Sequence, residues 1–74
     1  PNSTIISRGY GRQSSGLVEV SRTGDIRATV AESGDEAMLI ARTLPHSSVI
    51  VSEDRKAAIR RAISEGASMI ILDD

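Results

Sequence analysis

Two adjacent carboxylates, Asp73 and Asp74, follow the four apolar residues 69–72. An apolar run of this length is consistent with a buried strand. Carboxylates at the end of a rigid strand supply the hard oxygen ligands that Mg²⁺ prefers, as in many phosphoryl-transfer sites. We therefore predict a metal-binding role for this pair, with the alternative that both side chains are simply solvated.

A second polar group follows the apolar residues Ile5 and Ile6 and contains two glycines and two arginines. Glycine allows the backbone to approach a ligand closely, and arginine binds phosphate or carboxylate groups through paired hydrogen bonds. The segment is a candidate contact region for a phosphate-bearing ligand, or else a turn with exposed arginines. Its residues are Arg8, Gly9, Tyr10, Gly11 and Arg12.

A third group, Gly34-Asp35-Glu36, stands where a helix is expected to begin. Ser33 and Glu36 have the spacing of a capping box, in which each side chain bonds a backbone amide of the first turn. The functional interpretation makes Asp35 a general base that accepts a proton from a substrate hydroxyl. The alternative is that these polar side chains only cap the helix.

No phosphate loop of the G-x-x-x-x-G-K-[ST] type occurs among the 74 residues. In enzymes with that loop, its backbone amides and lysine hold the phosphates of the nucleotide. The three polar groups are therefore not accompanied by a phosphate-binding loop within these 74 residues.

The elements that must position these groups alternate along the chain. Apolar runs predict strands at residues 5–7, 48–52 and 69–72. A helix is predicted over 37–44, which Pro45 ends, and a second helix is ended by a left-handed cap at Gly66. The predicted apolar face of the second helix consists of Ala58, Ile59, Ala62 and Ile63.

Two further β-rich runs, 17–20 and 26–30, flank a five-residue loop and predict a hairpin. The whole pattern predicts an α/β fold, with a β-α-β-α-β parallel sheet and an inserted β-hairpin. Ligands bind outside the carboxyl ends of such strands. Residues 8–12, 53–55 and 73–74 should therefore converge on one edge.

Length and composition limit the possible domain size, partners and membrane association. Seventy-four residues support one small domain, and a single aromatic residue limits its core. A net charge of -1 favours no nucleic-acid partner, and the absence of cysteine excludes disulfides. No apolar run is long enough to span a membrane. Because the chain stops directly after an apolar run, we expect a single partial domain over residues 1–74.

Four segments, taken in order, resemble the tetraacyldisaccharide 4′-kinases, the lipid A 4′-kinase family. Each motif is weak by itself, but four in this order and spacing are fairly specific. The resemblance covers essentially the whole chain and implies part of a P-loop NTPase-like kinase domain. The matching segments are residues 6–12, 34–36, 52–55 and 70–74.

Membership of this family would imply transfer of the ATP γ-phosphate to the 4′-hydroxyl of a tetraacylated disaccharide 1-phosphate, the lipid A precursor. It would also imply Mg²⁺ as cofactor and a location at the cytoplasmic face of the inner membrane. Asp35 resembles the family's proposed catalytic base, with Glu36 beside it in the substrate or nucleotide region. Asp73 and Asp74 resemble the acidic pair near the metal, and residues 8–12 resemble part of the active-site wall.

Two departures from the family pattern matter. Ala37 stands where the family usually has proline, and the family's phosphate loop would precede residue 1. We therefore predict that the isolated chain is inactive, because phosphoryl transfer depends on positioning and electrostatics. The alternative function is a small non-catalytic α/β module that binds an anion or a partner. An exposed sheet edge also predicts self-association.

Overall fold

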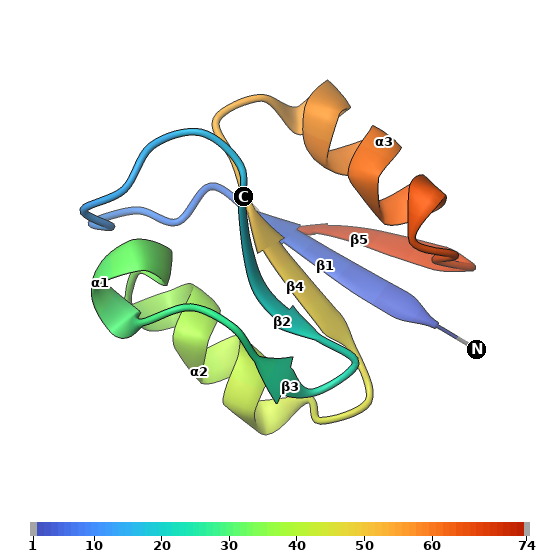
Figure 1. The fold of residues 1–74 in the computed structure, drawn as a ribbon, viewed down its shortest axis with the longest axis horizontal. Coiled ribbons are helices and arrows are strands. Elements are labelled where there is room, and N and C mark those ends of the chain that lie inside the picture. The colour runs from blue at the N-terminus through green and yellow to red at the C-terminus, as the bar shows by residue number, and fades with distance from the viewer. Residues whose placement is uncertain (1, 74) are drawn as a thin grey trace.

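Five strands form one mixed sheet in the computed structural model, which describes residues 2–73 (Figure 1). The strand order is β3-β2-β4-β1-β5. Strand β1 pairs in parallel with β4 on one side and with β5 on the other, as the alternation of strands and helices predicts. The elements are β1 (Ser3–Ser7), β2 (Val18–Arg22), β3 (Asp25–Ile26), α1 (Val30–Ser33), α2 (Asp35–Thr43), β4 (Ser48–Val51), α3 (Arg55–Ser64) and β5 (Met69–Asp73).

The hairpin has different boundaries from those predicted. Strands β2 and β3 pair in an antiparallel manner around Thr23 and Gly24, so the turn has two residues rather than five. Both turn residues have positive φ, 49° and 86°, as required by the hairpin turns that match strand twist. The hairpin joins the main sheet, because β2 also pairs antiparallel with β4. Val30 belongs to α1 and not to a strand.

The predicted capping box at Ser33 and Glu36 is wrong. The box lies four residues earlier, where Thr29 accepts from the Glu32 amide at 3.2 Å and Glu32 accepts from the Thr29 amide at 2.8 Å. Ser33 is instead the last residue of α1, and its hydroxyl donates to the Gly34 carbonyl at 2.9 Å. Gly34 ends α1 with a φ of 86° and serves as the N-cap of α2 without a side-chain cap.

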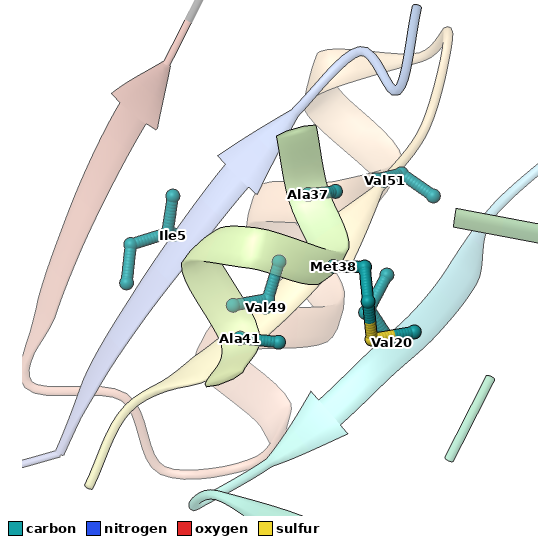
Figure 2. Packing of buried hydrophobic residues seen from close by; sticks show 7 residues of the cluster. All are labelled: Ile5, Val20, Ala37, Met38, Ala41, Val49 and Val51. Carbon is teal, nitrogen blue, oxygen red and sulfur yellow. The ribbon is translucent and has the colours of Figure 1, made fainter. Parts of the chain in front are cut away.

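Two small cores cover the two faces of the sheet. Alternation along β1 and β4 sends Ile5, Val49 and Val51 toward α2, and Ile6 and Ile50 toward α3. Figure 1 shows α1 and α2 on one side of the sheet and α3 on the other. In Figure 2, small side chains of α2 lie over the sheet, which lets the helix pack closely: the labelled cluster is Ile5, Val20, Ala37, Met38, Ala41, Val49 and Val51.

Strand β5 is not the buried strand that its apolar sequence predicts. It has one hydrogen-bonded neighbour, and Met69, Ile71 and Leu72 are 56, 45 and 44% exposed. Ile63, placed by prediction on the apolar face of α3, is 61% exposed, whereas Ala58 and Ala62 are fully buried. The exposed edge is consistent with the predicted self-association, which stays a prediction.

Candidate functional site

The carboxyl ends of β4, β1 and β5 lie side by side. Ser7 ends β1 and lies opposite both Val51 of β4 and Asp73 of β5. The Ser52 amide donates to the Ser7 carbonyl at 3.0 Å, which keeps the two chains together as they leave the sheet. The polar segments that follow β1 and β4 therefore begin at one edge, with Asp73 across from them.

A surface hollow of about 290 Å³ lies over the loop that follows β1. Its lining brings the predicted glycine and arginine segment together with a residue that follows β4. The lining residues are Arg8, Gly9, Tyr10, Gly11, Arg12, Ser14 and Glu53. Residues 53–55 were expected at this edge, but no site role was predicted for Glu53.

Arg12 points into the protein. Its side chain is only 4% exposed and forms an ion pair with Glu53, whose side chain is 62% exposed. The guanidinium also donates to the Ser14 hydroxyl at 3.1 Å and to the Gly16 carbonyl at 2.6 Å. The hydrogen bond that the Arg12 guanidinium donates to the Glu53 carboxylate is the main cause that holds the pKa of Glu53 below its ordinary value. Arg8 and Tyr10 lie at the surface of the same loop.

The two glycines of the predicted segment have different surroundings. Gly9 has a φ of 69° and is buried, and a Cβ there would lie 3.0 Å from the Ser33 carbonyl and 3.1 Å from the Val51 side chain. Gly11 also has positive φ, but a Cβ there would meet nothing within 4 Å. The close backbone approach expected of this segment is thus made at Gly9, to the protein's own chain.

The same loop reaches the start of α2. A Cβ on Gly34 would lie 2.9 Å from the Tyr10 carbonyl, so the two backbones are in direct contact. Asp35 and Glu36 follow at the first turn of α2, where both side chains are exposed. Within residues 2–73 the side chain of Asp35 makes no hydrogen bond or ion pair.

Asp73, one of the two predicted metal ligands, lies on β5 beside β1. Asp73 is the last residue of β5 and is partly buried, and Asp74 lies outside the described residues. Within residues 2–73 no three His, Cys, Asp or Glu side chains gather closely enough to hold a metal. Asp73 still fits Mg²⁺, because that ion commonly takes only one or two protein carboxylates and completes its shell with phosphates and water.

Asp54 has a clear structural role. Its side chain caps α3 by accepting from the Ala57 amide at 3.2 Å. The Ser52 hydroxyl in turn accepts from the Asp54 amide at 3.0 Å. These two hydrogen bonds fix the direction in which the chain leaves β4, and with it the position of Glu53.

Over residues 2–73 no helix has both the length and the apolar character needed to cross a membrane.

Comparison with known proteins gives one consistent family. The sequence model of the tetraacyldisaccharide-1-P 4′-kinase family, LpxK, matches residues 2–74. A tetraacyldisaccharide 4′-kinase of Aliarcobacter butzleri is 52% identical over 73 residues, which are 99% of this chain and 23% of that protein. The Helicobacter pylori strain 26695 enzyme is 47% identical over 70 residues, 95% of this chain and 22% of that protein.

A solved structure agrees with these sequence matches. The "apo" form of LpxK from Aquifex aeolicus, in complex with ATP, superposes with a TM-score of 0.88 and 44% identity. The match covers 99% of this chain and 24% of that chain. The chain therefore spans less than a quarter of the length of these relatives.

Proposed function

Because the chain belongs to the tetraacyldisaccharide-1-P 4′-kinase family, we propose that it forms part of the active site of a full-length kinase. That kinase transfers the γ-phosphate of ATP to the 4′-hydroxyl of a tetraacyldisaccharide 1-phosphate. The observation that carries the proposal is the family match over residues 2–74, together with the polar groups at the carboxyl ends of the parallel strands. This edge is where open α/β sheets bind their ligands.

Asp35 is the general base of the proposed reaction. Its carboxylate is exposed and has no partner within residues 2–73, so it is available to a substrate hydroxyl. Its backbone is fixed by the contact between Gly34 and the Tyr10 carbonyl. A general base must lie within roughly 2.6–3.2 Å of the atom whose proton it accepts, and a rigid helix start suits that requirement. Glu36 lies beside it in the same turn and belongs to the substrate region.

The hollow over the loop that follows β1 takes the phosphate-bearing ligands. Arg8 and the exposed Tyr10 line it, while the guanidinium of Arg12 is directed at Glu53. Asp73, with Asp74, would hold Mg²⁺, which neutralises the charge that develops on the transferring phosphate. Support for ATP comes from the Aquifex relative, whose structure contains it.

The 74 residues alone do not catalyse this reaction, because they include no phosphate loop to hold ATP. We place the reaction of the full-length protein at the cytoplasmic face of the inner membrane, since its proposed acceptor is a lipid A precursor. The alternative is a non-catalytic module that binds an anion in the hollow.

A phosphate-transfer assay separates the two functions. The full-length protein that contains this chain, given ATP labelled at the γ-phosphate and tetraacyldisaccharide 1-phosphate, should label the lipid in a Mg²⁺-dependent manner. The 74-residue chain under the same conditions should give no labelled lipid. An absence of transfer by the full-length protein, in the presence of measurable anion binding, would establish the non-catalytic alternative.

A further inference from the structure

A closed ring of hydrogen bonds joins Arg12, Gly16 and Glu53. One carboxylate oxygen of Glu53 accepts from the Gly16 amide at 2.9 Å, and the other pairs with the Arg12 guanidinium. The same guanidinium nitrogen donates back to the Gly16 carbonyl at 2.6 Å. Gly16 has a φ of 74°, a conformation that favours glycine. The ring therefore ties the loop after β1 to the residue that follows Ser52.

The burial of the two charges is unequal. The Arg12 side chain is 4% exposed, and Glu53 is its one carboxylate partner within residues 2–73. A buried charge is costly without a partner, so removing Glu53 would leave the arginine uncompensated and favour rearrangement of the loop. Glu53 remains largely exposed. The pair is thus a support for the loop and is not a solvated surface ion pair.

The opposite side of this loop is attached to α1. The Gln13 amide donates to the Ala31 carbonyl at 2.6 Å, and the Ser14 hydroxyl donates to the Glu32 carbonyl. Helix α1 ends at Ser33, directly before Gly34 and Asp35. A shift of the loop would be transmitted to the start of α2 through these bonds, and through the contact between Gly34 and the Tyr10 carbonyl.

We infer that Arg12 and Glu53 are positioning residues for the phosphoryl transfer: they hold residues 9–16 between the end of β4 and α1, and so fix Asp35. This inference rests on the proposed function. Arg12 then acts on the reaction through the loop and does not bind a ligand phosphate. Of the two arginines in the segment, Arg8 is the one at the surface of the hollow.

The test uses the full-length protein with Glu53→Gln, Arg12→Gln and the double variant. A displaced base slows chemistry without weakening nucleotide binding, so each single variant should lower kcat about tenfold to a hundredfold. The dissociation constant for ATP should stay within about twofold of wild type, since no ligand contact is removed. The double variant should be no slower than the slower single variant, because both substitutions break the same pair.

Arg27→Gln is the matched control. Arg27 also pairs with glutamate and aspartate side chains, at 3.3 Å, but on the hairpin. The Arg27→Gln variant should leave kcat unchanged. Ser14→Ala is a milder variant that removes one acceptor of Arg12, and it should lower kcat less than Arg12→Gln. Weaker ATP binding in Arg12→Gln, with wild-type behaviour in Glu53→Gln, would instead make Arg12 a ligand-binding residue. Wild-type kcat in both single variants would overturn the inference.

Hydrogen exchange of the Gly16 amide gives a readout that does not depend on activity. Glu53→Gln should accelerate exchange at Gly16 and at Gln13, whereas Arg27→Gln should not. Unchanged exchange in Glu53→Gln would show that the pair does not hold the loop. If the wild-type full-length protein has no kinase activity, the proposed function fails, and the exchange result still decides whether the pair holds the loop.

Discussion

Glutamate carboxylates have opposite surroundings in two regions of the molecule. At the carboxyl end of the sheet, Glu53 faces the Arg12 guanidinium, and the hydrogen bond between them lowers the pKa of Glu53 from its ordinary value of 4.5. At the end of α3, Glu65 meets the carboxyl group of Glu19 on β2. That contact is the largest cause that raises the pKa of Glu65 above 4.5, with burial second.

The second region leaves two oxygens without partners. One carboxylate oxygen each of Glu19 and Glu65 is buried and makes no hydrogen bond within the described part of the chain. Arg27 lies 3.3 Å from the other oxygen of Glu19, and Arg61 lies 3.8 Å from the other oxygen of Glu65. The charges of Arg22 and Arg61 partly offset the rise in the pKa of Glu65. A single proton between the two carboxylates would satisfy both unpartnered oxygens.

The two regions therefore depend on pH with opposite signs. The stabilisation from Glu53 is present above pH 4.5 and is lost as pH falls through its lowered folded-state pKa. The stabilisation from protonated Glu65 is present below pH 4.5 and is lost as pH rises through its raised folded-state pKa. The ionised form of Glu53 is thus favoured by its pairing with Arg12, whereas the ionised form of Glu65 is disfavoured by Glu19 and by burial.

The largest expected effect comes from disrupting the backbone contact between Gly34 and the Tyr10 carbonyl, next to the candidate site. Gly34→Ala places a Cβ 2.9 Å from the Tyr10 carbonyl at a φ of 86°, so it combines backbone strain with a clash. We expect a loss of about 3 kcal/mol in the free energy of unfolding, measured by chemical denaturation.

Gly66→Ala at the end of α3 is the matched control for that change. Gly66 has nearly the same φ, 87°, but a Cβ there would meet nothing within 4 Å. Backbone strain alone should cost about 1 kcal/mol. Equal losses in the two variants would mean that the contact between Gly34 and Tyr10 does not hold the loop against α2.

A smaller effect is expected from removing the contact between the carboxyl groups of Glu65 and Glu19. Glu65→Gln replaces one carboxylate with an amide that can donate to Glu19. At pH 8 it should raise the free energy of unfolding by roughly 0.5–1 kcal/mol, and the gain should shrink as pH falls toward 4.5. Unfolding of both proteins over this pH range measures the difference. A gain that is independent of pH would show that repulsion between Glu19 and Glu65 is not its source.

The parallel core and the shared strand edge could be predicted from the sequence, because they follow from local pattern and topology. Short apolar runs located β1, β4 and β5, and parallel pairing requires their polar ends to meet. Gly66 was identified from its position after an amphipathic segment, and its positive φ confirms that prediction. These features depend on neighbouring residues alone.

Features that depend on distant partners could not be predicted. Two segments have capping-box spacing, but the box forms at Thr29 and Glu32, and Gly34, with φ 86° and ψ 158°, separates Ser33 from α2. The pairing of Arg12 with Glu53 joins residues 41 positions apart. No local pattern distinguishes such an arginine from one that binds a ligand. The exposure of β5 likewise depends on its position at the edge of the sheet.

Single-turnover phosphoryl transfer by the full-length protein carrying Asp35→Asn tests the central claim most directly. Asparagine keeps the shape of the side chain but cannot accept the proton, so we predict a rate lower by about 10²–10⁴-fold with ATP binding retained. Asp25→Asn, the same change at the exposed end of the hairpin, should transfer phosphate at the wild-type rate. Near-normal transfer by Asp35→Asn would remove Asp35 from the mechanism and contradict the account.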